Sequence, residues 1–178
     1  KVMLDGVEIR APYLDGRLAV PLPSGATPAD TFAPEFLYHG VPDNGLILRR
    51  NVHGRPSVFA DNWPNRARFW FPAVDHPSDK ATATFTVHAP ASWVVVPKGA
   101  REGEPTEGPS TLDGSRRRTW RWSIKEPVST YNFVIGAAEM VIVPLGTAPC
   151  GRAPNSRRED GCVEVSAWLF AEDAGQAQ

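Results

Sequence analysis

The side chains best suited to a site gather in residues 59–85, where carboxylates, arginines and large aromatic rings alternate with prolines. Arg68 and Asp75 are spaced to form an ion pair across a loop. Asp75 and Ser78 can each accept a backbone hydrogen bond at a turn. On residue chemistry alone, the segment is a structural corner held by one ion pair.

The middle of this segment predicts a short strand. Phe69 and Phe71 would share one face and Trp70 the other, and Pro72 would end the strand because proline has no amide donor.

No complete catalytic apparatus is recognisable in the sequence. It contains no Ser/His/Asp arrangement, no glycine-rich phosphate loop and no cysteine-nucleophile signature. The histidines include no pair at i and i+4, and each is interpreted as a surface or turn residue; they are His39, His53, His76 and His88. We therefore expect no catalytic residue and no metal site in this chain.

Composition sets the class of protein. The 178 residues suit a single domain, and 42% are apolar, enough for a real core. The formal net charge of −1 argues against nucleic acid as a partner. No apolar run is long enough to span a bilayer, and no signal peptide is visible.

Two features have a structural and a functional interpretation. Cys150 and Cys162 flank a polar loop and could form a disulfide, which would favour a secreted or periplasmic location; the alternative is two unrelated thiols. The basic run around residues 116–121 could bind an anion or nucleic acid, but the net charge favours a solvated strand face whose arginines protect a sheet edge.

Alternation with a period of two indicates an all-β protein. Residues 81–88 place Ala81, Ala83, Phe85 and Val87 on one face and polar side chains on the other. Asp5-Gly6 and Asp15-Gly16 each predict a tight hairpin, because glycine readily takes the positive φ of such turns.

Further strands are expected at short intervals, as in a β-sandwich. Their predicted bounds are Val2–Leu4, Val7–Tyr13, Arg17–Leu22, Glu35–His39, Leu46–Arg50, Ser57–Ala60, Trp93–Pro97, Arg117–Ile124, Tyr131–Val143 and Val163–Phe170. Residues 99–115 are predicted to form a long exposed hairpin loop, and 171–178 the start of a linker after a domain over 1–170.

Three stretches, in one order along the chain, resemble the N-terminal domain of the aminopeptidase N family of zinc peptidases. The first is Ala67–Ala81, in which Ala-Arg, Phe-Pro, Asp, Pro and Lys-Ala stand at the family's spacing, with Phe85 following on the strand. The others are Tyr38–Leu46 and Pro127–Val143. Three ordered matches are far more specific than any single one.

The resemblance implies a saddle-like antiparallel β-sandwich, the N-terminal domain of a gluzincin aminopeptidase, lacking its first strands. In this family the zinc and the general base lie in the next domain, within an H-E-x-x-H motif that this sequence does not contain. The implied partners are that catalytic domain and a peptide substrate. Zinc is expected in the catalytic domain.

The resemblance also implies a substrate-binding position. A Gln or Glu before the Ala-Arg pair helps to bind the substrate's α-amine, because an ammonium needs acceptors. Trp63 stands in that register here, so Asp61 or Asn62 could substitute, or Trp63 could line a pocket for an apolar side chain. The alternative is a turn with an aromatic plug.

The sequence is therefore interpreted as a noncatalytic domain that forms one wall of a peptidase's substrate site, with a structural loop held by Arg68, Asp75 and Lys80. The alternative hypothesis is a free-standing β-sandwich for binding or adhesion. That module would leave Trp63 and Trp70 in solvent, whereas the family interpretation buries most of the segment.

Overall fold

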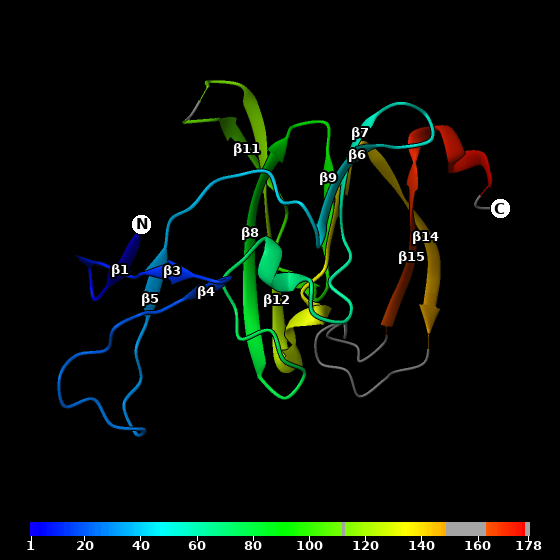
Figure 1. Ribbon diagram of the computed structural model, residues 1–178. Coiled ribbons are helices and arrows are strands. Elements are labelled where there is room, and N and C mark those ends of the chain that lie inside the picture. Colours follow the sequence, from blue (N-terminus) through cyan, green and yellow to red (C-terminus); the bar gives the residue numbers. More distant parts are fainter. Residues whose placement is uncertain (112, 149–162, 177–178) are drawn as a thin grey trace. The chain divides into compact units, whose positions relative to one another are not determined.

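The structure is a computed structural model that describes residues 1–111, 113–148 and 163–176 (Figure 1). The chain divides into two compact units, Lys1–Val41 and Pro42–Gln178. The sequence predicts one domain over 1–170.

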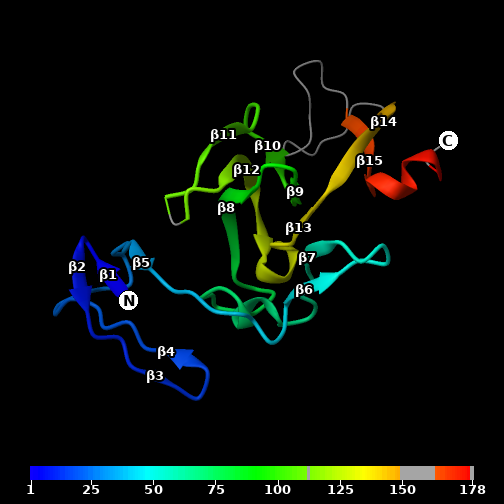
Figure 2. The ribbon, with the colours of Figure 1, turned by 90° about the horizontal axis from the view of Figure 1, so that it is seen from above.

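The first unit is built from short strands joined by tight turns. Asp5 and Gly6 both have positive φ, 50° and 78°, as do Asp15 and Gly16, at 50° and 73°. Both predicted hairpins are confirmed, although the strands expected over Val7–Tyr13 and Arg17–Leu22 are shorter than predicted. The strands are β1 (Val2–Leu4), β2 (Val7–Ile9), β3 (Tyr13–Leu14), β4 (Arg17–Leu18) and β5 (Pro34–Phe36). They form a sheet in the order β2-β1-β5 and a β3-β4 hairpin (Figure 2).

The first sheet of the second unit is organised around one long strand. It comprises β8 (Lys80–Pro90), β10 (Ala100–Arg101), β11 (Thr106–Pro109) and β12 (Arg116–Ser129). Strand β12 pairs with β8 along one edge and with β10 and β11 along the other (Figure 1). The prediction of a continuous loop over 99–115 is wrong, because two strands interrupt it. These two strands have too few apolar side chains to show an alternation of apolar and polar residues.

A second sheet has the strand order β6-β7-β13-β9. Its strands are β6 (Leu46–Arg50), β7 (Pro56–Ala60), β9 (Val94–Pro97) and β13 (Ile135–Ala138). Strands β14 (Met140–Ala148) and β15 (Val163–Phe170) form a separate antiparallel pair.

One prediction about the C-terminal part needs correction. The strand expected over Tyr131–Val143 is broken into the 3-10 helix η2 (Thr130–Asn132), β13 and β14. The residues predicted to begin a linker, 171–178, include a further 3-10 helix, η3 (Ala171–Gln176). Acidic side chains of η3 contact the turn between β6 and β7: Asp173 bonds His53, and Glu172 bonds Arg55.

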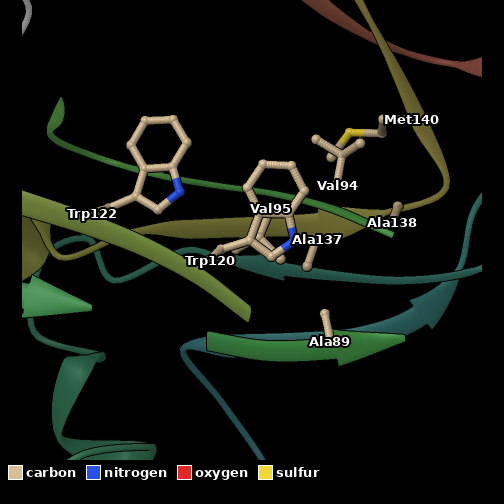
Figure 3. Packing of buried hydrophobic residues seen from close by; sticks show 8 residues of the cluster. All are labelled: Ala89, Val94, Val95, Trp120, Trp122, Ala137, Ala138 and Met140. Carbon is tan, nitrogen blue, oxygen red and sulfur yellow. The ribbon is translucent and has the colours of Figure 1, made fainter. Parts of the chain in front are cut away.

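The core of this unit combines side chains from both four-stranded sheets. Trp120 and Trp122 of β12 pack with Val95 of β9 and Ala137 of β13 (Figure 3). Burying such aromatic rings supplies much of the apolar area that stabilises a small β domain. Every strand pair in the described part of the chain is antiparallel, which confirms the predicted all-β, antiparallel fold.

Candidate functional site

The predicted site residues lie in residues 61–79, which connect β7 to β8 and are called the β7–β8 loop below. The loop is tied to the start of β6, because the Asp61 amide donates to the Gly45 carbonyl oxygen at 2.7 Å. Gly45 has a φ of 76°, and a Cβ there would collide with the Arg66 carbonyl oxygen. Glycine is therefore required at this close approach of two backbones.

Asn62 anchors the loop to the interior. Its side-chain nitrogen donates to the Phe133 carbonyl oxygen at 2.8 Å, and its side-chain oxygen accepts from Trp70 Nε1 at 2.8 Å. The residue is 1% exposed. A buried amide bonded on both sides holds its surroundings in one conformation. The side-chain atoms of Asn62 are therefore bonded inside the domain, whereas the side chains of Asp61 and Trp63 lie at the surface.

Asp61 and Trp63 lie at the surface on either side of this anchor. The Asp61 side chain is 48% exposed, and Trp63 is 62% exposed. The Arg66 guanidinium joins them, since Nη1 lies 3.0 Å from Asp61 Oδ2 and Nε donates to the Trp63 carbonyl oxygen at 2.6 Å. The carboxylate and the aromatic residue are therefore neighbours in space as well as in sequence.

The strand expected at Phe69–Phe71 is instead the 3-10 helix η1 (Ala67–Phe69). Asp75 explains the difference, because its Oδ2 accepts from the backbone N–H of Arg68 at 3.2 Å and so binds a donor that a strand would use for pairing. Ala67 is buried and Phe69 exposed. The segment is a corner, as its chemistry suggested, but a helical one.

Asp75 is the centre of that corner. Its side chain is 2% exposed and also accepts from Arg68 Nε at 3.2 Å, so the expected ion pair is present. Its Oδ1 accepts from the Thr130 hydroxyl at 2.6 Å. The neighbouring Ser129 hydroxyl donates to the Pro77 carbonyl oxygen at 2.6 Å. Asp75 thus joins the loop to η2, more than fifty residues away.

Sequence reasoning missed the three residues at 129–131. Ser129 and Thr130 hold the loop, and the Tyr131 ring lies edge to face with Trp63, with centroids 5.0 Å apart. A signal existed: these residues are the Ser-Thr-Tyr of the third stretch that resembles the peptidase family.

Lys80 begins β8, where its backbone pairs with Ser129, and it is exposed. No ion pair to its side chain is found among the residues that the structure describes. Its part in holding the loop stays a prediction.

The basic run of β12 is paired with acids. Glu107 of β11 binds Arg116 at 2.7 Å and Arg118 at 2.5 Å, and Asp113 binds Arg117 at 3.1 Å. The hydrogen bond and charge of Arg118 lower the pKa of Glu107, and hydrogen bonds from Ser115 lower the pKa of Asp113. This face therefore offers little uncompensated positive charge, as expected of a solvated strand face.

Within the described ranges, no three His, Cys, Asp or Glu side chains converge on a position that could hold a metal ion. The donor set of these residues does not fit zinc. Cys150 and Cys162 lie outside the described residues, so their disulfide stays a prediction. No helix in the described part is long and apolar enough to cross a membrane.

Comparison with known proteins points to one family of peptidases. Residues 47–132 match the model of the peptidase M1 N-terminal domain, and this span includes the whole β7–β8 loop. Over these residues, the chain is similar to the peptidase M1 N-terminal domain. It is 28% identical over 124 residues to leucine aminopeptidase 2 of Pyricularia oryzae, covering 68% of this chain and 18% of that protein.

Solved structures agree on the fold. An M1 zinc metallopeptidase from Deinococcus radiodurans superposes with a TM-score of 0.72 at 20% identity, covering 96% of this chain and 37% of that one. A two-domain M1 zinc metallopeptidase mutant bound to L-arginine gives a TM-score of 0.73 at 21% identity, with the same coverage. The chain thus spans well under half of the length of the proteins that it resembles.

Proposed function

We propose that this chain is the noncatalytic N-terminal domain of a zinc-dependent aminopeptidase, where it forms one wall of the substrate site and positions the peptide's N-terminus. The observation that carries the proposal is the contrast within the β7–β8 loop of an M1 domain. Asp61 and Trp63 are exposed, while Asn62 and Asp75 are buried and hold the backbone beneath them.

Asp61 is the residue of this loop best suited to an ammonium group. Its Oδ2 is paired with Arg66, but a carboxylate has about four acceptor positions on its two oxygens. A free α-amine could therefore bind without displacing the arginine. Asn62 contributes indirectly, since its two hydrogen bonds fix the backbone from which Asp61 projects.

The proposed partners are the enzyme's catalytic domain and a peptide. Zinc, held in that catalytic domain, would supply an activated water for hydrolysis. The residues described in this chain do not fit zinc, so their contribution is limited to binding and orientation. The exposed face of the β7–β8 loop would lie toward the catalytic domain, which accounts for its exposure in the domain alone.

The direct test is Asp61→Ala in the complete protein. Loss of the acceptor should raise KM or lower kcat for peptides with a free amine by about tenfold, the usual effect of one lost charge-assisted hydrogen bond. Asp43→Ala is the matched control, because Asp43 is also an exposed loop carboxylate. Unchanged KM and kcat for Asp61→Ala would remove Asp61 from the site.

One observation favours the alternative of a binding module without peptidase activity. Trp63 is 62% exposed, as expected of a ligand platform. Trp70 is not, because it is half-buried and bonded to Asn62. Hydrolysis of amino-acid anilides by the complete protein separates the two: a protein that binds peptides without cleaving them supports the module.

A further inference from the structure

Trp63 and Tyr131 form an aromatic corner at the surface of the second unit. The two rings are nearly perpendicular, at 85°, with centroids 5.0 Å apart. They come from the β7–β8 loop and from η2, two segments that Asp75 joins through Arg68 and Thr130. Both segments that carry the two rings are therefore held in place by hydrogen bonds to Asp75.

An exposed tryptophan is usually mobile, but Trp63 is held in place. Its carbonyl oxygen accepts from Arg66, its ring rests on Tyr131, and the preceding residue is the buried Asn62. A large apolar surface that is both fixed and 62% exposed is suited to a ligand, because little side-chain entropy remains to be lost on binding.

The corner is also electrically balanced. Asp61 stands two residues before Trp63, and Arg66 pairs with its carboxylate at 3.0 Å. The same guanidinium contacts the Trp63 backbone, so Asp61 and Trp63 lie within the span of one side chain. An α-amine and a side chain diverge from one carbon atom, and this arrangement offers an acceptor for the first beside an apolar wall for the second.

We infer that the Trp63–Tyr131 corner contacts the side chain of the substrate's first residue and selects peptides that begin with a large apolar or aromatic residue. The inference rests on the proposed function and names its substrate class. Trp63 acts here as a specificity residue, separate from the amine-binding role of Asp61.

The test compares kcat/KM for leucine and alanine para-nitroanilides in the complete protein. Trp63→Ala should lower the leucine-to-alanine ratio about tenfold, the range for losing part of an apolar pocket. Trp63→Phe should lower it about twofold to threefold, because a smaller apolar face remains. Phe69→Ala is the matched control: Phe69 is an exposed aromatic of the same loop and should leave the ratio unchanged.

The outcomes separate the inference from the proposed function. Equal losses on both substrates in Trp63→Ala would overturn the inference and leave the proposed function standing. If both Trp63→Ala and Asp61→Ala leave both substrates unaffected, or the wild-type protein cleaves neither, the proposed function fails and the inference with it. Trp63→Phe provides the same comparison if the alanine variant does not fold.

Discussion

Two aspartate–arginine pairs stand within fifteen residues of each other in the β7–β8 loop, and they differ in nearly every physical respect. Asp75, with its side chain 2% exposed, receives hydrogen bonds from Arg68 and Thr130. Asp61, with its side chain 48% exposed, is paired only with Arg66 among the described residues. The first carboxylate is surrounded by protein donors, whereas the second retains acceptor capacity.

The difference gives the two carboxylates different physical consequences. A buried, fully bonded carboxylate fixes backbone geometry, because removing it leaves donors without partners. An exposed, singly paired carboxylate adds little to stability and is available to a ligand. The same two residue types thus occupy opposite surroundings, with one carboxylate buried and the other exposed.

The largest expected effect on stability comes from replacing Asp75, the buried carboxylate of the two pairs. Asp75→Ala should lower the free energy of unfolding by about 3 kcal/mol, because the Thr130 hydroxyl and the Arg68 amide lose their acceptor. Urea unfolding of the chain measures this. Asp79→Ala, an exposed aspartate four residues later, is the control. Equal effects from the two substitutions would show that Asp75 does not hold the loop.

A second, smaller effect is expected at the anchor between the two pairs. Asn62→Ala should cost about 2 kcal/mol, since Trp70 Nε1 and the Phe133 carbonyl would each lose a hydrogen bond inside the domain. The exposed Asn65 provides the control substitution to alanine. A change below about 0.5 kcal/mol would contradict the assignment of Asn62 as an anchor.

Replacing Asp61, the exposed carboxylate, should have little effect on stability. Asp61→Ala is expected to change the free energy of unfolding by less than about 0.5 kcal/mol, because an exposed ion pair is largely screened by solvent. The same urea experiment measures it. A loss comparable to that of Asp75→Ala would remove the distinction between the two carboxylates.

The smallest expected effect extends the comparison to an exposed pair on a strand. Arg118 lowers the pKa of Glu107 in the folded state, so the pair stabilises the fold above the ordinary value of 4.5 and loses that contribution as the pH falls through the lowered pKa. Glu107→Gln should therefore make stability less dependent on pH below about 4.5. Urea unfolding between pH 3 and 7 tests this, with the highly exposed Glu104→Gln as control.

Local pattern was sufficient for much of the fold. Strands β1, β6 and β15 have the predicted bounds. Local pattern did not predict β10 and β11. These short strands form because their backbones pair with β12. Cross-strand partners of this kind have no local periodicity to reveal them.

In the candidate site, too, the sequence predicted a contact between residues close along the chain but not the contacts between distant segments. The Arg68–Asp75 pair could be predicted because its members are seven residues apart. The contacts of Thr130 and Tyr131 could not, because they join segments more than fifty residues apart along the chain. The burial of Asn62 likewise depends on Phe133 and Trp70, which its own sequence context does not indicate.

The most direct test of the central claim is a crystal structure of the complete protein with a peptide whose first amide bond is replaced by a non-hydrolysable one. We expect the peptide's α-amine to lie about 3 Å from the Asp61 carboxylate, with its first side chain against Trp63. A peptide bound with its N-terminus away from the β7–β8 loop, with Asp61 still paired only to Arg66, would contradict it.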